Sequence, residues 1–251
     1  MNPLFDLSGQ CALVTGAASG LGQGISVALA EAGADVSLVS LDESLETAEM
    51  VKRTGRKAHI IRADLHDIAR AKATVDETVQ TFGKVDILVN NAGIIRRTPA
   101  LEFSERDWDD VMEINAKTVF FMSQAAAKDM VKRSKGKIIN IASLLSFSGG
   151  INVPSYSASK GAVAQITKSL ANEWARLGLN INAIAPGYMV TLNTTALRQD
   201  LAREKAITER IPAGRWGSPA DLAGAAVFLA SPASDYVNGH VLVVDGGWMA
   251  R

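Results

Sequence analysis

The sequence predicts an α/β protein: a single doubly wound domain, with a seven-stranded parallel sheet and helices on both faces. Short apolar and β-branched runs alternate with longer helical patterns along all 251 residues. The strand candidates, such as ALVT, ILVN and KIINIA, are almost continuously apolar, as parallel strands covered on both faces are. No linker rich in proline, glycine or serine divides the chain, so one domain is expected.

The alternation defines the elements in order. Seven strands are expected, at residues 10–15, 35–40, 57–63, 85–90, 137–142, 180–185 and 240–244. Helices are expected between them, at residues 21–32, 43–54, 67–82, 105–133, 155–177 and 219–230. Glycines in the left-handed conformation are expected to end the helices, at Gly33, Gly55, Gly83, Gly136 and Gly178.

One segment interrupts this rhythm. Residues 187–217 separate the sixth strand from the last helix and carry a helical pattern of their own at 194–209. Long insertions in compact domains are usually functional or disordered. Because this one follows the carboxyl end of a strand, where open α/β sheets bind ligands, it is predicted to be an ordered substrate lid.

Composition excludes several classes of partner. Lys and Arg number 26, and Asp and Glu also number 26, so no basic excess points to nucleic acid or to an anionic membrane. No apolar run reaches the roughly 18–20 residues of a membrane span, and the start, MNPLFDLSGQ, does not resemble a signal peptide. The one cysteine, Cys11, begins a strand pattern and is expected to be buried, which suits a reducing cytoplasm.

The first strand runs into a glycine-rich turn, TGAASGLGQG, at residues 15–24. Gly16, Gly20 and Gly22 leave space for a pyrophosphate to approach the backbone, and the following helix offers its free N–H groups. A glycine-rich turn placed after the first strand of a βαβ unit predicts a dinucleotide site, whereas the alternative is a tight turn with a closely packed helix.

The stretch SYSASKG places Tyr156 four residues before Lys160, so on a helix the two side chains share a face. Two unit charges about 4–5 Å apart attract by roughly 3–4 kcal/mol at an effective dielectric constant of about 20. Lys160 is therefore expected to lower the Tyr156 pKa from about 10 to about 7–8, making the phenol an acid and base near neutral pH. For the motif alone, an amphipathic pair with a solvated lysine is the alternative.

Other polar residues stand at strand ends or inside helices. Ser143 ends the fifth strand thirteen residues before Tyr156, and Asn115 lies inside a long helical pattern, where asparagine is unfavourable. VNNAGII, at residues 89–95, follows the fourth strand. The three histidines have no metal-ligand spacing, so no metal is expected.

These motifs together resemble the short-chain dehydrogenase/reductase family, in order and over nearly the whole chain. The resemblance implies a Rossmann-type sheet with strand order 3-2-1-4-5-6-7. It also implies a catalytic set in which Tyr156 is the general acid and base, Ser143 hydrogen-bonds the reacting oxygen, Lys160 tunes the tyrosine and holds the nicotinamide ribose, and Asn115 supports a water relay. The implied cofactor-binding residues are Gly16, Ser19, Gly20, Leu21, Gly22, Leu41, Asp64, Leu65, Asn91, Ala92, Gly93, Tyr156, Lys160, Pro186, Gly187, Met189 and Thr191.

Longer stretches, among them NNAGIIRR, NAIAPGYM and RIPAGRWGSPADL, are similar to the branch of this family that acts on deoxy sugar acids of the 2-deoxy-D-gluconate and 2-dehydro-3-deoxy-D-gluconate type. Such a substrate carries a carboxylate, which the planar fork of Arg96 or Arg97 would match. A solvated role or a subunit contact is as plausible for that pair. The expected substrate contacts are Arg96, Ser143, Tyr156 and Tyr188.

Cofactor choice depends on the end of the second strand. In the resembled family an NAD-selecting aspartate usually stands at the position of Ser40, so this sequence departs from the pattern. Leu41 is uncharged, and Asp42 would repel the 2′-phosphate of NADP. NAD is therefore the predicted cofactor, with NADP less favoured.

Two other functions remain open: an NADPH-dependent 3-oxoacyl-carrier-protein reductase with the same catalytic residues, and a dinucleotide-sensing protein without catalysis. The resemblance also implies a homotetramer built on two helices and on the C-terminal segment. The helical pattern that begins at Tyr156 has small residues at Ala158, Gly161 and Ala162, and Trp248 would anchor a second interface.

Overall fold

The computed structural model describes residues 2–251 as one α/β domain with a parallel seven-stranded sheet, in the order β3-β2-β1-β4-β5-β6-β7. The predicted fold class and strand order are confirmed. All seven predicted strands form: β1 Cys11–Thr15, β2 Asp35–Ser40, β3 Ala58–Arg62, β4 Ile87–Asn90, β5 Gly136–Ile141, β6 Leu179–Pro186 and β7 Val241–Val244.

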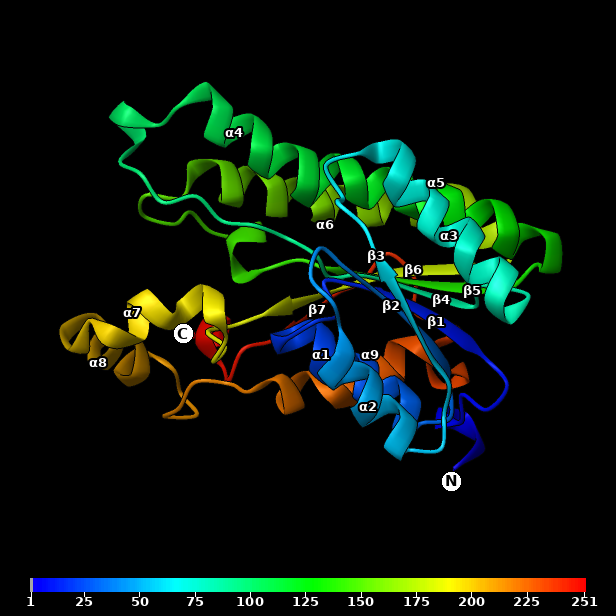
Figure 1. The fold of residues 1–251 in the computed structure, drawn as a ribbon. Helices are drawn as coiled ribbons and strands as arrows, with labels where there is room; N and C mark the ends of the chain where they lie inside the picture. The colour runs from blue at the N-terminus through cyan, green and yellow to red at the C-terminus, as the bar shows by residue number, and fades with distance from the viewer. Residues whose placement is uncertain (1) are drawn as a thin grey trace.

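Helices cover both faces of the sheet (Figure 1). They are α1 Gly20–Glu31, α2 Leu45–Arg53, α3 Ile68–Phe82, α4 Glu105–Met112, α5 Thr118–Met130, α6 Pro154–Trp174, α7 Thr195–Gln199, α8 Leu201–Arg210 and α9 Ala223–Ala230. The apolar core accordingly has two main halves. Ile25 of α1, Val51 of α2 and Leu229 of α9 pack on one face. Val75 of α3 and Met122 of α5 pack on the other.

The central strands are buried along their whole length, which explains their unbroken apolar sequence. Every residue of β1 and β4 is buried, because each strand has a neighbour on both edges and helices above and below. Cys11 is buried at 2% exposure, as expected. In residues 2–251 no helix has the length and apolar character needed to cross a membrane.

The long helical pattern at 105–133 is two helices with a wider turn between them. Glu113–Lys117 forms a π-helical turn that joins α4 to α5, and the Thr118 N–H donates to the carbonyl of Glu113. Such turns are rare and are found mostly at functional sites. Asn115 lies inside this turn, which the sequence pattern could not distinguish from an ordinary helix.

Four of the five glycines expected to end helices are left-handed: Gly33, Gly55, Gly83 and Gly178. The prediction for Gly136 is wrong. Ser134 takes the left-handed conformation, with φ of 49°, and Gly136 begins β5. A Cβ atom on Gly136 would collide with the side chain of Met130, so this glycine is required by close packing.

Residues 187–217 are ordered, but they form two short helices, α7 and α8, which meet at Asp200 instead of one continuous helix. The Asp200 side chain accepts the Arg203 N–H and begins α8. The two ends of the segment are joined by a bridge between Met189 and Gly217. In Figure 1, α7 and α8 lie to one side of the sheet, beyond the carboxyl ends of its strands and close to the C-terminus.

Candidate active site

The glycine-rich turn at the carboxyl end of β1 has the close backbone packing that its sequence predicts. Gly16 is left-handed, with φ of 65°, and a Cβ there would lie 3.0 Å from the Cα of Ala92. A Cβ on Gly22 would collide with the Gly16 carbonyl oxygen. Ser19 is the N-cap residue of α1 and its side chain makes no capping bond. The turn and the start of α1 therefore leave backbone N–H groups facing outward, as an anion site requires.

Neighbouring strands hold this turn in place. The Asn91 side chain donates to the carbonyl of Thr15 at 2.9 Å, and the Thr15 hydroxyl accepts the N–H groups of Asn91 and Ala92. The Ser40 hydroxyl accepts the Ala18 N–H at 2.9 Å. The side chain of Asn91 is thus committed to bracing the turn, and Ser40 occupies the usual acidic position with a bond to the turn itself.

The residues expected to perform catalysis meet at the start of α6. Pro154 is the first residue of this helix and fits there because its position needs no N–H. Two and six residues further on, Tyr156 is half-buried and Lys160 is buried, and the Lys160 ammonium lies 5.6 Å from the centre of the phenol ring. The Lys160 ammonium donates to the carbonyl of Ile141, at the end of β5, at 2.6 Å.

Ser143 lies two residues after the end of β5 and is the N-cap of a short 3-10 turn. Its hydroxyl accepts the Leu145 N–H at 3.1 Å, and Ser146, in the same turn, donates to the Lys160 carbonyl at 2.6 Å. Ser146 was not singled out by the sequence, although it ties the Ser143 turn to α6. The twelve residues between Ser143 and Tyr156 bring the tyrosine back to the serine, whose hydroxyl acts on the Tyr156 pKa.

The electrostatics differ from the sequence estimate. Burial raises the pKa of Tyr156 above its ordinary value, while the Ser143 hydroxyl and the positive charge of Arg97 act in the opposite direction. Burial lowers the pKa of Lys160 from 10.5 to about 8. The expected lowering of the Tyr156 pKa by Lys160 is therefore wrong for this arrangement: burial has the largest effect on the phenol, and the Lys160 ammonium donates to Ile141 instead.

Asn115 reaches the same region from the π-helical turn. Its amide exchanges two hydrogen bonds of 2.9 Å with the backbone of Ile94, and it also donates to Ser159 at 3.1 Å. A Cβ on Gly93 would lie 3.2 Å from the Asn115 amide oxygen and 3.8 Å from the Lys160 ammonium. Gly93 therefore leaves the space that separates Asn115 from Lys160.

The two arginines after β4 point to different partners. Arg96 lies 3.4 Å from each of two carboxylates of α4, those of Asp107 and Asp110. Arg97 donates to the carbonyl of Asn193, in the segment of residues 187–217, at 3.0 Å. Its charge also acts on the Tyr156 pKa. Arg96 was the expected substrate contact, but Arg97 is the arginine whose charge reaches the phenol.

The segment of residues 187–217 closes over the Ser143 turn through an aromatic cluster. Tyr188 packs between Trp216 and Trp248, with ring centres 5.3 Å and 4.7 Å away, and Leu144 joins the same cluster. Thr191 lies near the glycine-rich turn: its methyl carbon is 3.7 Å from where a Cβ of Gly20 would lie. The structure thus brings Thr191 to the predicted cofactor site and places the Tyr188 ring in packing contacts.

The remaining predicted cofactor residues lie at the same edge of the sheet. Leu41 follows β2 and is exposed, while Asp64 and Leu65 follow β3. The Asp64 carboxylate accepts the His66 N–H at 2.9 Å, which lowers its pKa. The others are a half-buried residue at the start of α1 and three residues at or after the end of β6: Leu21, Pro186, Gly187 and Met189.

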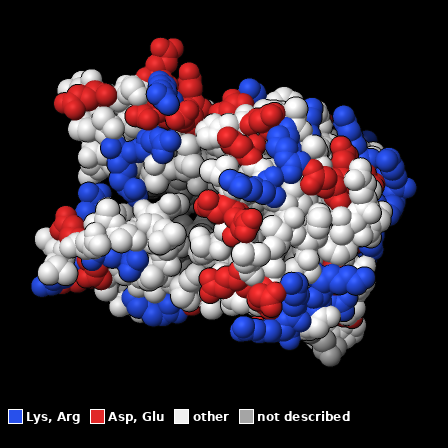
Figure 2. Space-filling view, viewed as in Figure 1, with Lys and Arg blue, Asp and Glu red and all other residues white. Residues whose placement is uncertain are grey.

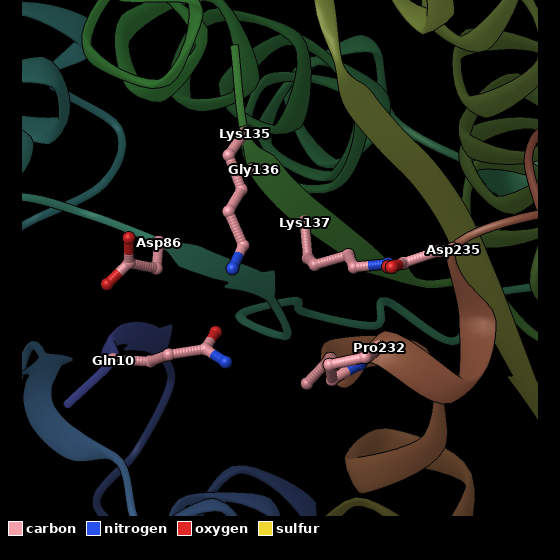
Figure 3. Close-up of a pocket in the computed structure, with 8 residues that line it drawn as sticks. Gln10, Asp86, Lys135, Gly136, Lys137, Pro232 and Asp235 are labelled. Carbon is pink, nitrogen blue, oxygen red and sulfur yellow. The ribbon is translucent and has the colours of Figure 1, made fainter. Parts of the chain in front are cut away.

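The outer surface is hollowed beside these strand ends. Figure 2 shows a recess between the surface over α4 and the surface over α7 and α8, with Lys and Arg side chains along its upper rim. A second, small pocket lies at the opposite edge, where Lys137 at the start of β5 points to the Asp235 carboxylate, 2.7 Å away (Figure 3). That pocket lies between the sheet and the segment after α9, and none of the predicted site residues lines it.

The comparisons with known proteins agree with this geometry. Residues 16–249 match the family model described as enoyl-(acyl carrier protein) reductase. The chain is 61% identical to the 2-dehydro-3-deoxy-D-gluconate 5-dehydrogenase of Dickeya dadantii and 58% identical to that of Escherichia coli. Each alignment covers 248 residues, 98% of this chain and 98% of the relative.

Two solved structures are similar over essentially the whole chain. A candidate 2-deoxy-D-gluconate 3-dehydrogenase of Agrobacterium tumefaciens with bound NADP is 56% identical, with a TM-score of 0.94 and full coverage of both chains. A gluconate 5-dehydrogenase of Burkholderia cenocepacia in complex with NADP and tartrate is 42% identical, with a TM-score of 0.94, covering 99% of this chain and 98% of that one. The family match and these relatives confirm the resemblance seen in the motifs: the chain belongs to the short-chain dehydrogenase/reductase family of nicotinamide-dependent oxidoreductases.

Proposed function

We propose that this chain transfers a hydride between a nicotinamide dinucleotide and a secondary alcohol or ketone of a deoxy sugar acid, of the 2-deoxy-D-gluconate or 2-dehydro-3-deoxy-D-gluconate type. The observation that carries the proposal is the meeting of Ser143, Tyr156 and Lys160 beside the glycine-rich turn. The names of the relatives at 61% and 58% identity support the substrate class.

The residues at the site fit the cofactor. The backbone around Gly16 and Gly22 has no room for side chains, and the N-terminus of α1 offers N–H groups and a positive dipole to a pyrophosphate. The backbone of Gly93 comes close to Asn115 and Lys160, and Lys160 is the residue that would hold the nicotinamide ribose. The nicotinamide ring, when bound, supplies the hydride acceptor or donor.

The protein's own groups handle the proton. In oxidation, the Tyr156 phenolate takes the hydroxyl proton of the substrate as the hydride leaves its carbon. In reduction, the phenol returns a proton to the forming alkoxide. The Ser143 hydroxyl donates to the same substrate oxygen and holds it against the phenol. Burial raises the Tyr156 pKa, so the phenol is protonated at neutral pH, as reduction needs. The positive charge of a protonated Lys160 would stabilise the phenolate that oxidation needs.

Lys160 and Asn115 complete the path for the proton. A lysine pKa of about 8 allows Lys160 to exchange a proton near neutral pH. The amide oxygen and nitrogen of Asn115 both bond the backbone of Ile94, so the π-helical turn is fixed next to Gly93 and Lys160. We assign Asn115 as a positioning residue for a water that relays the proton from Lys160 to solvent.

Arg97 is the proposed anchor of the substrate carboxylate. Arg96 is committed to Asp107 and Asp110, whereas the charge of Arg97 reaches the phenol and its guanidinium contacts the segment of residues 187–217. A carboxylate bound by Arg97 would connect the substrate to that segment, which we propose acts as a lid over the reacting carbon.

The preference between NAD and NADP is decided at the ends of β2 and β3. From the sequence, the uncharged Leu41 and the carboxylate of Asp42 predict NAD. The bound NADP of the Agrobacterium and Burkholderia structures supports the opposite preference. We retain NAD as an accepted cofactor, and we expect NADP to be accepted as well, for the reason given in the next subsection.

We also propose a homotetramer. On α6, Ala158 is exposed and a Cβ on Gly161 would meet no atom within 4 Å, so small residues face outward. A groove between α5 and α6 is lined by Phe120 and Trp174, both half-buried. This is the surface expected to pair across a two-fold axis.

The unpaired thiol of Cys11 supports a reducing compartment such as the cytoplasm.

The test is a substrate panel. Purified protein is assayed with NAD and with NADP against 2-deoxy-D-gluconate, D-gluconate, neutral sugars and simple alcohols, and formation of the reduced cofactor is followed by absorbance. In the reverse direction, 2-dehydro-3-deoxy-D-gluconate-type ketones are compared with an acetoacetyl thioester. Turnover restricted to sugar acids is expected. A preference for the thioester would indicate the carrier-protein reductase instead, and cofactor binding without any turnover would indicate the sensing protein.

A further inference from the structure

The ends of β2 and β3 lie side by side, and an arginine of β3 extends over the end of β2. In the parallel register Ser40 pairs with Arg62. The Arg62 Nε donates to the carbonyl of Leu41 at 3.0 Å, so its guanidinium is fixed next to the residues that follow β2. Arg62 lies on β3, outside the end of β2 and the glycine-rich turn that the family pattern uses to predict cofactor choice.

That position borders the adenosine half of the proposed cofactor site. In doubly wound folds the ribose of the adenosine is bound at the carboxyl end of the second strand. Here the Ser40 hydroxyl bonds the Ala18 N–H, so the end of β2 and the glycine-rich turn are in direct contact. A ribose placed between them would have its 2′ position near Leu41 and hence near Arg62.

The guanidinium of Arg62 is available to an anion. Arg62 is exposed, and no carboxylate in the described residues 2–251 forms an ion pair with it. Its bond to Leu41 uses the Nε–H and leaves the two terminal nitrogens, which can bind a phosphate in bidentate fashion. Nearby charges are engaged elsewhere: Asp64 with His66, and Arg70 with Glu77.

We propose that Arg62 binds the 2′-phosphate of NADP(H) and so allows this site to accept NADP despite Asp42. The proposal rests on the proposed function, since it assumes that a nicotinamide dinucleotide binds here. Asp42 is the opposing group: its carboxylate repels a phosphate, and Arg62 offsets that repulsion from the neighbouring strand. Cofactor preference is then set by the balance of one carboxylate and one guanidinium.

The test measures binding without catalysis. The nucleotides 2′,5′-ADP and 5′-AMP share the adenosine and differ by one phosphate, and calorimetry gives their dissociation constants for the wild type, Arg62→Met, Arg62→Lys and Asp42→Asn. Arg53→Met serves as a control because Arg53 ends α2 and is also exposed. Thermal unfolding of each variant establishes that it is folded.

Arg62→Met is expected to weaken 2′,5′-ADP binding about tenfold or more and to change 5′-AMP binding less than about twofold. Arg62→Lys should retain part of the affinity, Asp42→Asn should strengthen 2′,5′-ADP alone, and Arg53→Met should change neither. Equal weakening of both nucleotides by Arg62→Met would overturn the proposal and indicate a contact with adenine. Unchanged binding of both would also overturn it. A wild type that binds neither nucleotide would contradict the proposed function itself.

Discussion

At this site, residues that are adjacent in the sequence contact different partners. Arg96 and Arg97 are adjacent, yet Arg96 pairs with carboxylates of α4, whereas Arg97 donates to the Asn193 carbonyl and acts through its charge on the Tyr156 pKa. Asn90 and Asn91 are also adjacent. Asn90 is buried in bonds to Ser123 and Asn140, whereas Asn91 braces the glycine-rich turn. Asn90 is the last residue of β4 and Asn91 the first after it, so their side chains point to different faces of the sheet.

At the residue scale, Tyr156→Phe is expected to lower kcat at least about a hundredfold while cofactor affinity stays within about twofold. The ring keeps its place at the start of α6, and only the proton that reaches the substrate oxygen is lost. Steady-state kinetics and titration with the reduced cofactor measure the two effects. Retention of more than about a tenth of kcat would contradict the assignment of Tyr156 as the acid and base.

Arg97→Met is expected to raise KM for a sugar acid about tenfold or more, because a charge-assisted bidentate contact with the carboxylate is lost. A neutral sugar alcohol should be affected far less. Arg96→Met is the matched control, since it removes a neighbouring guanidinium that is bound to α4. Equal effects of the two variants on KM would show that neither arginine recognises the carboxylate.

Lys160 predicts a specific dependence of stability on pH. Its pKa in the folded protein, about 8, lies below the ordinary 10.5, so the unfolded chain binds more protons between these values and the free energy of unfolding rises with pH across this window. Below about pH 8 the cost of burying the charged lysine is fully present. It amounts to at most about 3 kcal/mol.

Lys160→Met removes this titration. Urea unfolding of the two proteins from about pH 7 to about pH 10.5 should show that the variant's advantage in stability shrinks as the pH rises. A constant difference between the two proteins across this range would mean that the folded-state pKa of Lys160 is not depressed.

At the scale of elements, packing between a helix and the strand that follows it decides where the helix ends. Gly136 illustrates this, because α5 and its 3-10 extension finish at Ser134 and the chain then turns directly into β5 beside Met130. The π-helical turn has a similar effect within the preceding helix, where it presents Asn115 to Ile94. In both cases the local pattern is continuous and the interruption comes from packing.

Gly136→Ala is expected to lower the free energy of unfolding by about 1–3 kcal/mol, because the new methyl group overlaps the Met130 side chain. Met130→Ala in the same chain should relieve part of that loss and give a coupling energy in a double-mutant cycle. Gly224→Ala is the control, since a Cβ on Gly224 in α9 would meet no atom within 4 Å. Equal destabilisation by the two alanines would show that steric overlap is not the cause.

At the scale of the whole molecule, the two ends of the parallel strands have different roles. The glycine-rich turn, the proposed catalytic residues and the segment of residues 187–217 lie at the carboxyl ends of the strands. At the amino ends of the strands lies Lys137, which is buried and donates to Asp235, Asn180 and Ser234. That cluster joins β5 and β6 to the segment after α9. The proposed active site and this structural cluster are thus separated by the length of the strands.

The homotetramer predicts a mass in solution of about four chains at micromolar concentration, measured by light scattering. Replacing Gly161 of α6 with a bulky charged residue, as in Gly161→Glu, should dissociate the helix-to-helix interface because the position faces outward and small residues surround it. Circular dichroism would establish that the variant stays folded. A wild type that is an active monomer of 26.6 kDa would refute the assembly.

The sequence alone determined the sheet and the strand positions, because these depend on local signals, and the order of its motifs predicted a catalytic set. Apolar runs of parallel strands, glycines that leave room for a backbone, and a tyrosine four residues before a lysine are each readable without distant neighbours. The identity of the family followed from their order along the chain.

Tertiary structure decided the rest, because it depends on contacts between residues far apart in the chain. Only the packing of β5 beside Met130 explains Gly136, and only the burial of α6 makes the Tyr156 pKa rise where a charge pair alone would lower it. The different partners of Arg96 and Arg97 follow from where α4 and residues 187–217 lie. Arg62 reaches the end of β2 because β3 pairs with it, 22 residues along the chain in parallel register.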